Sequence, residues 1–316
     1  MKQKQTQLAV FAVALVALLS LLTLVSRTGY GQSQAEEKAS VTPALKPLAL
    51  VEKRTAVAAA EKRDASLFAE AAERNTLLKY ELSWAFGGKQ QRGWYLYTPL
   101  ISRLLETEGE AAGSDFASSL SRWQNGAGLR PSGVLDDETL YRMVSTWQGA
   151  RLKNKEYATP DRLLQAPTSD FYDPTRPDAL RQVERETYAA YKRMIAAAAA
   201  DPSLGLKVTA AGELAPEEKF FKIVSSFRSR EHQAALRAQS PGSGRAGLAV
   251  NSPHFTGRAL DLYVGGEPVE TRDSNRALQV QTPAYRWLVR NAERFGFRPY
   301  YYEPWHWEYV GADAGK

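Results

Sequence analysis

Two short segments hold histidine and acidic residues at spacings that could build a metal site. His254 and Asp261 lie seven residues apart in SPHFTGRALDL, and His306 follows 45 residues later in EPWHWEY. Two imidazoles and one carboxylate form an N/N/O ligand set, which suits Zn²⁺ with a fourth position left for water. Glu303, three residues before His306, could take a proton from that water, because a metal lowers the pKa of water to about 7.

The local sequence explains how Asp261 could be buried beside His254. Residues 258–264 alternate as in a strand, so that Asp261 lies on one face and leucines lie on the other. If the sheet is covered on both faces, Asp261 is buried, and a buried carboxylate is costly unless it is paired or metal-bound. Gly257 permits a sharp turn between His254 and this strand. A lone histidine near one aspartate is usually a surface pair or a satisfied core residue, but the full set is harder to explain in that way.

The composition narrows the chemistry further. The 316 residues include three histidines and no cysteine, which excludes disulfides, Cys-ligated zinc, iron–sulfur clusters and a cysteine nucleophile. The length predicts about two domains. The net charge of +6 favours an anionic partner such as nucleic acid, anionic lipid or a cell-wall polymer.

The N-terminal segment, residues 1–27, has the pattern of an export signal. Lys2 and Lys4 precede an apolar run from Leu8 to Val25 that could just span a bilayer. Ser33–Ala35 is a poor cleavage site, so an uncleaved anchor is favoured over a cleaved signal peptide. We therefore expect an extracytoplasmic protein, in the periplasm or cell envelope, that is anchored to the cytoplasmic membrane, or secreted if the segment is cleaved.

Composition shifts divide the remaining chain into four parts. Residues 28–55 are polar and aperiodic, as in a flexible tether. Residues 56–150 predict a small helical domain, and the four prolines of residues 151–177 predict a linker. Residues 178–316 predict an α+β domain, with a small mixed or antiparallel sheet and flanking helices. In this last domain we expect a helix from residue 178 onward, a helix at 283–295, and strands at 220–226, 259–264, 300–302 and 307–310.

The helical domain carries a first resemblance. Phe116, Leu120 and Trp123 share one helix face, and Asp136 or Asp137 is positioned to cap a following helix. The pairs WQ, GL, GV and TL within residues 123–140 resemble the three-helix peptidoglycan-binding module of cell-wall hydrolases, although a serine replaces the usual aspartate. The resemblance implies that this domain binds cell-wall polymer, and a helical spacer without a ligand is the alternative.

The metal-site segments carry a second and more specific resemblance. S-x-H-x-x-G-x-A-x-D followed by E-P-W-H resembles the zinc D-alanyl-D-alanine carboxypeptidases of the VanY type. The upstream segment VSSFRSREHQ is similar to that family's S-G-Y-R-S-x-x-x-Q, and the similarity covers about residues 180–310. It implies a Zn²⁺ peptidase in which His254, Asp261 and His306 are the ligands and Glu303 is the general base and then acid.

The same resemblance implies roles for four further residues. Arg228 would stabilise the oxyanion or grip a substrate carboxylate, since a guanidinium is always charged and binds two oxygens. Gln233 and Ser252 would contact the substrate, and Trp305 would pack beside the metal and shape the pocket. The third histidine, His232, is expected to be exposed or to lie behind the ligands rather than to be a fourth ligand.

The leading hypothesis is a metallopeptidase that removes the terminal D-alanine of peptidoglycan stem peptides. One alternative is an endopeptidase of the same family that cuts within the stem, for example at L-Ala–D-Glu. Another is a non-catalytic cell-wall-binding adaptor, which would not need the base Glu303. Expected partners are stem peptides, cell-wall polymer through residues 56–150, and the membrane through the N-terminal helix. Nucleic acid is the weakest alternative, because the chain lacks an aromatic-basic ribbon and is expected to be exported.

Overall fold

The computed structural model describes residues 66–86, 88–240 and 249–311. The chain divides into two compact units, Met1–Glu52 and Lys53–Lys316, and every described residue belongs to the second. The predicted membrane segment and tether lie outside the described residues. None of the helices within the described ranges combines the length and the apolar character needed to span a bilayer.

The first part of the described chain, residues 66–152, is called the helical part. Besides a helix over residues 66–81 it contains β1 (Ser83–Phe86), β2 (Lys89–Arg92), η1 (Tyr95–Tyr97), α2 (Thr98–Leu105), α3 (Ser114–Gly126) and α4 (Asp137–Ala150). The antiparallel β1–β2 hairpin is a correction to the expected all-helical domain. A Gly-Gly pair separates the two strands, and Gly88 adopts φ +80°, the left-handed conformation that hairpin turns require.

Two features predicted for helices of the helical part, the cap of α4 and the buried face of α3, are confirmed. Asp136 caps α4, because its side chain accepts a hydrogen bond of 2.9 Å from the backbone N–H of Thr139. Phe116 and Leu120 of α3 are fully buried in the core. Three of the residue pairs that resemble the peptidoglycan-binding module, WQ, GV and TL, are connected by the side chain of Gln124. This side chain accepts a hydrogen bond from Gly133 N at 2.8 Å and donates one to Thr139 Oγ1 at 3.0 Å. These motif residues therefore stabilise the connection between α3 and α4.

The second part, residues 153–311, is called the C-terminal part. Its strands are β3 (Leu163–Gln165), β4 (Gln182–Glu184), β5 (Ile223–Ser225), β6 (Ala259–Leu262), β7 (Phe297–Pro299) and β8 (His306–Tyr309). Its α-helices are α5 (Arg185–Ala199), α6 (Arg230–Gln239), α8 (Asp273–Gln281) and α9 (Pro283–Asn291). Short 3₁₀ helices are η2 (Pro160–Arg162), η3 (Thr168–Asp170), η4 (Asp178–Leu180), η5 (Pro202–Leu204), η7 (Pro253–Thr256) and η8 (Ala292–Phe295).

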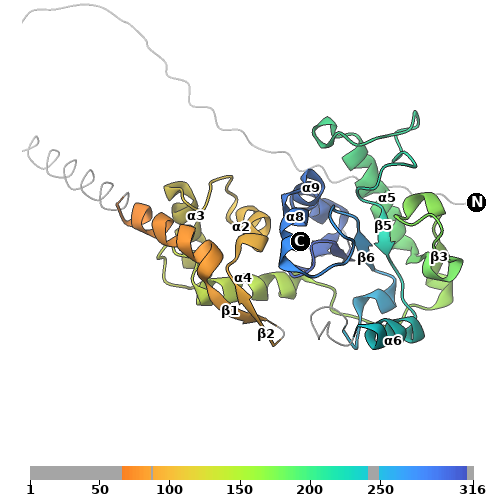
Figure 1. Ribbon diagram of the computed structural model, residues 1–316, viewed down its shortest axis with the longest axis horizontal. Helices are drawn as coiled ribbons and strands as arrows, with labels where there is room; N and C mark the ends of the chain where they lie inside the picture. Colours follow the sequence, from red (N-terminus) through yellow and green to blue (C-terminus); the bar gives the residue numbers. More distant parts are fainter. Residues whose placement is uncertain (1–65, 87, 241–248, 312–316) are drawn as a thin grey trace, which may run out of the picture. The chain divides into compact units, whose positions relative to one another are not determined.

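A four-stranded antiparallel sheet in the order β5-β6-β8-β7 forms the centre of the C-terminal part (Figure 1). Its register places Asp261 of β6 directly opposite His306 of β8. A separate two-stranded sheet pairs β3, from the predicted linker, with β4. The structure thus confirms a small antiparallel sheet with flanking helices.

Two predicted elements differ from the structure. The helix expected from residue 178 begins only at Arg185, where Glu184 caps it by accepting a hydrogen bond from Thr187 N. Residues 300–302 form a turn instead of a strand, because Glu303 N bonds Tyr300 O at 3.1 Å and His306 N bonds Glu303 O at 2.9 Å. These reverse-turn bonds bring Glu303 back over the start of β8.

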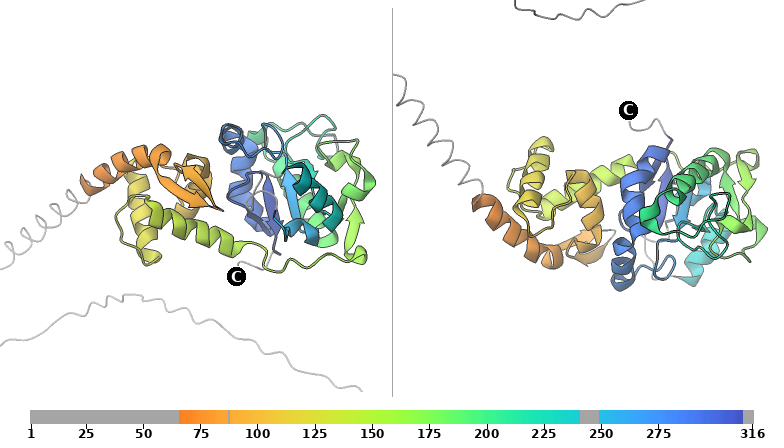
Figure 2. Two further views of the ribbon diagram at one scale, coloured as in Figure 1. Left: turned by 60° about the horizontal axis from the view of Figure 1, so that its bottom comes forward. Right: turned by 90° about the horizontal axis from the view of Figure 1, so that it is seen from above.

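The helical part packs on α8 and α9, which lie between it and the sheet (Figure 2). One cluster of buried apolar side chains runs through both parts. Tyr97 and Trp147 of the helical part contact Tyr301, with ring centroids 5.5 and 6.0 Å away. Arg276 of α8 adds a buried hydrogen bond of 2.9 Å to the Tyr97 hydroxyl. The turn that carries Glu303 is therefore supported from the helical part.

Candidate metal centre

Three predicted ligands meet at the centre of the sheet. His254 comes from η7, Asp261 from β6 and His306 from β8, and all three are buried. One potential ligand atom from each lies within 4.8 Å of the others. Asp261 Oδ1 is 3.3 Å from His254 Nε2 and 2.9 Å from His306 Nδ1. The antiparallel register and the turn at Gly257 thus bring together residues that are distant in the sequence.

His254 presents its Nε2 atom to this group. Its Nδ1 lies 2.7 Å from the carbonyl oxygen of Ser226, and a carbonyl can only accept, so Nδ1 carries the proton and Nε2 keeps a lone pair. Burial, together with the nearby Arg228, lowers the pKa of His254 to about 4. The ring is therefore neutral at pH 7, as a metal ligand must be. Ser252 accepts from His254 N at 3.3 Å, which stabilises the start of η7.

His306 presents its Nδ1 atom. Its Nε2 lies 3.2 Å from Glu308 Oε1. Burial alone would raise the pKa of Glu308, but contacts with His306 and Arg151 lower it to about 2, so the carboxylate is an obligate acceptor. Burial would likewise lower the pKa of His306, but Asp261 and Glu308 raise it to about 9. Without a metal the ring is therefore protonated near pH 7, and a cation at Nδ1 would take the place of that proton.

Asp261 is oriented by Arg228. Its Oδ2 accepts a hydrogen bond of 2.5 Å from Arg228 Nη2, which leaves Oδ1 facing the histidines. Burial opposes ionisation of Asp261, but His254 and Arg228 hold its pKa well below the usual range. Arg228 also donates to Ser225 Oγ at 2.9 Å and to Gln233 Oε1 at 3.4 Å. The predicted Arg228 and Gln233 therefore lie directly behind the metal group.

Glu303 lies at the edge of the same group. Its Oε2 is 3.9 Å from His306 Nδ1. Burial raises the pKa of this carboxyl to about 8, although His306 opposes the rise. A group with a pKa near neutrality can both take up and return a proton, which suits general acid–base chemistry.

The remaining predicted residues take structural positions. Trp305 is buried in the core, and its carbonyl accepts from Leu262 N at 2.8 Å. His232 is half-buried on α6 and is not part of the metal-ligand group. The donor atoms of His254, Asp261 and His306 fit a divalent cation, because both histidines have their other nitrogen engaged and the carboxylate is held ionised.

The C-terminal part is similar to a known protein family. Residues 180–312 match the VanY family model, described as D-alanyl-D-alanine carboxypeptidase. No curated protein matches the chain. The match supports a VanY-type domain and indicates a peptidase that acts on peptidoglycan. The matched segment includes every predicted site residue. It begins at residue 180, so the helical part lies outside it.

Two residues beside the predicted ligands, Glu308 and Arg151, were not predicted from the sequence. Glu308 follows His306 by two positions in β8, so the strand period places both on one face; that spacing could have indicated it. Arg151 lies 157 residues earlier and contacts Glu308 through Nε at 3.1 Å and through Nη2. No local pattern connects this arginine with the metal group.

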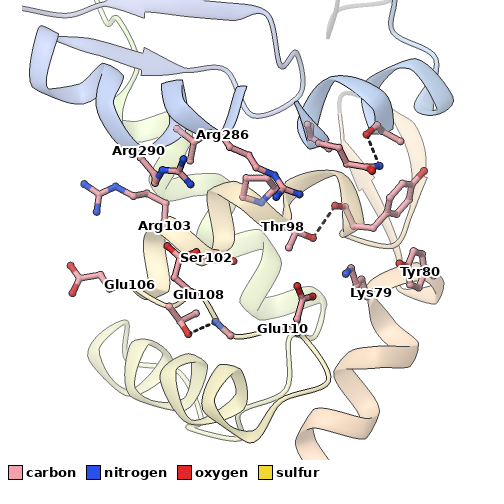
Figure 3. A pocket seen from close by; sticks show the side chains of 18 residues that line it. Lys79, Tyr80, Thr98, Ser102, Arg103, Glu106, Glu108, Glu110, Arg286 and Arg290 are labelled. Carbon is pink, nitrogen blue, oxygen red and sulfur yellow. Dashed lines mark hydrogen bonds between the residues drawn. The ribbon is translucent and has the colours of Figure 1, made fainter. Parts of the chain in front are cut away.

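A separate cavity of about 670 Å³ lies between α2 and α9 and is lined by none of the predicted site residues. Arg103 of α2 and Arg286 and Arg290 of α9 gather on one side of it, and Lys79 lies on the other (Figure 3). Glu106, Glu108 and Glu110 also contribute to its lining. The cavity mixes both signs of charge and is distinct from the metal centre.

Replacing Gly257 with alanine is expected to destabilise the turn that positions His254. Gly257 adopts φ +68°, and a Cβ there would lie 2.9 Å from Glu184 N and from Leu163 Cδ2. The left-handed conformation and the steric overlap together should reduce the free energy of unfolding by about 2–3 kcal/mol, measured by urea denaturation. Gly128→Ala is the matched control, since φ is +72° but no atom lies within 4 Å; it should lose only about 1 kcal/mol. Equal losses would contradict the packing argument.

Proposed function

We propose that the VanY-type domain is a zinc-dependent D,D-carboxypeptidase that removes the terminal D-alanine of peptidoglycan stem peptides. The observation that carries this proposal is the convergence of His254, Asp261 and His306, with His254 Nε2 and His306 Nδ1 at 3.3 and 2.9 Å from Asp261 Oδ1. Each of these atoms can give a lone pair to a cation, His306 Nδ1 after it loses its proton, because another polar atom of the same side chain is already hydrogen-bonded.

The donor set supports zinc over the harder divalent cations. Mg²⁺ and Ca²⁺ prefer all-oxygen sites, whereas two imidazoles and one carboxylate with an open fourth position are typical of catalytic zinc. When bound, zinc would polarise the scissile carbonyl and lower the pKa of water at the site. The chain's own residues would supply the orientation and the proton transfer.

In this proposal Glu303 accepts the proton of the attacking water and then delivers a proton to the leaving amine. Its raised pKa of about 8 supports both directions of transfer. The Arg228 guanidinium holds Asp261 and brings a fixed positive charge beside the reacting groups. That charge would favour a developing oxyanion or the terminal carboxylate of a substrate.

The proposed cellular setting rests on the sequence outside the VanY-type domain. Lys2, Lys4 and the apolar run from Leu8 to Val25 support export and anchoring in the cytoplasmic membrane. The pattern of residues 123–140 supports cell-wall binding by the helical part. We therefore propose a membrane-anchored enzyme of the periplasm or cell envelope whose helical part contacts the wall polymer.

A muropeptide digest tests the proposed activity. Incubating pentapeptide muropeptides with the protein should release a single terminal D-alanine, detected by mass spectrometry, and a chelator should abolish the release. Two peptide fragments would instead identify an endopeptidase that cuts within the stem. Unchanged muropeptides, together with purified protein that lacks stoichiometric metal, would favour a non-catalytic adaptor.

A further inference from the structure

The carboxylate of Glu308 connects a predicted metal ligand to the end of the helical part. Glu308 is fully buried in β8. Its Oε1 faces His306 Nε2 at 3.2 Å and accepts from Arg151 Nε at 3.1 Å and from Arg151 Nη2. Its Oε2 accepts from the backbone N–H of Leu152 at 2.9 Å. Within the described residues, every donor to Glu308 other than His306 therefore comes from the Arg151-Leu152 segment.

The Arg151 side chain, where the helical part ends, has contacts on two sides. It is the residue that terminates α4, and its Nη1 donates to Gln148 Oε1 of that helix at 2.7 Å. Its guanidinium lies over the ring of Tyr300, 4.0 Å from the centroid, in a favourable cation–π position. Only 15% of its side chain is exposed. The orientation of Arg151 is thus set by α4 on one side and by the turn before β8 on the other.

A buried carboxylate needs such partners to keep one orientation. Without Arg151, the Glu308 carboxylate would keep only His306 and one backbone N–H as partners, and its side chain would be free to turn away from His306. A displaced Glu308 would no longer hold His306 with Nε2–H toward the carboxylate and Nδ1 toward the cation. Partners behind a histidine ligand affect metal affinity for this reason.

We propose that Arg151 is a positioning residue for the metal centre, acting through Glu308 to orient His306, so that the end of the helical part completes the site. This inference rests on the proposed metal function. Arg151 lies outside residues 180–312, which match the family model, so the VanY-type segment alone lacks the partner of Glu308. The helical part is then required for tight metal binding, whether or not it also binds the wall.

Zinc affinity of the full chain, measured by competition with a chromophoric chelator, tests the proposal without relying on activity. Arg151→Gln is expected to weaken zinc binding about 10–100-fold. Arg151→Lys should be intermediate, because an ammonium cannot reproduce the paired Nε and Nη2 contacts. The double variant Arg151→Gln/Glu308→Gln should bind no more weakly than Glu308→Gln alone, because both changes interrupt the same connection.

Tyr97→Phe is the matched control. It removes the other buried side-chain hydrogen bond between the helical part and the C-terminal part, from Arg276, without touching Glu308. Its zinc affinity should equal that of the unchanged protein, whereas equal weakening in Tyr97→Phe and Arg151→Gln would indicate general loosening and overturn the proposal.

Other outcomes are equally decisive. Unchanged zinc affinity in Arg151→Gln, or additive losses in the double variant, would overturn the role of Arg151 while leaving the proposed function intact. If circular dichroism shows that Arg151→Gln is unfolded, Arg151→Lys decides by the same criterion: affinity equal to the unchanged protein contradicts the proposal. Failure of the unchanged protein to bind stoichiometric zinc would overturn both proposals.

Discussion

Replacing Glu303 with glutamine is expected to abolish D-alanine release while zinc remains bound. Glutamine has nearly the same shape but cannot accept the proton of the attacking water, and loss of a general base typically lowers kcat by about 10²–10⁴-fold. The proposed metal ligands His254, Asp261 and His306 are untouched. Turnover of a pentapeptide muropeptide and zinc content by elemental analysis would be measured on the same preparation.

A control and a stability measurement sharpen this prediction. Glu293→Gln changes an exposed glutamate of η8 that pairs with Arg298 at 3.0 Å, and it should retain activity. The Glu303→Gln protein should unfold at the same temperature as the unchanged protein or higher, because burial already disfavours the charged carboxylate. Full activity in Glu303→Gln would exclude the proposed base.

Removing the metal is the second change with a large expected effect. Dialysis against a chelator should eliminate D-alanine release, and Zn²⁺ but not Mg²⁺ should restore it, because two of the three donors are imidazoles. The metal-free protein should also unfold at a lower temperature. A ligand that binds only the folded state adds about 4.1 kcal/mol of stability at a free concentration of 1,000 Kd.

Calorimetry with and without Zn²⁺, beside the D-alanine assay, checks both expectations. In His254→Ala the stabilisation by added zinc should largely disappear, since one of the three donors is lost. Glu293→Gln, which changes an exposed residue paired with Arg298, should keep the zinc-dependent shift. Activity that persists in the chelator-treated protein would contradict a metal mechanism.

Local sequence rules predicted much of the metal centre. The alternating pattern around Asp261 placed it in a buried strand, and Gly257 marked the turn that follows His254; the structure has both. Helix signals such as the Asp136 cap were equally reliable. Each of these features depends on residues within a few positions, where backbone sterics and side-chain hydrogen bonds are decided by neighbours.

The secondary-structure predictions were wrong where a segment's intrinsic preferences for two conformations were similar in free energy. Tyr300–Tyr302 has the aromatic composition of a strand, but hydrogen bonds between Tyr300, Glu303 and His306 form a turn there instead. The Gly-Gly pair before Lys89 indicates a turn, but the strands on either side of that turn were not predicted. Tertiary packing selects between such alternatives, because their intrinsic preferences differ by only about 1 kcal/mol.

The sequence by itself determined which chemical groups are available: two histidines, an aspartate in a strand and a glutamate three residues before the second histidine. Only the tertiary structure decided which atom of each group faces the other two. The register that sets Asp261 opposite His306 and the approach of Arg151 to Glu308 join segments 45 and 157 residues apart. Such contacts result from the burial of a whole core, and no local preference encodes them.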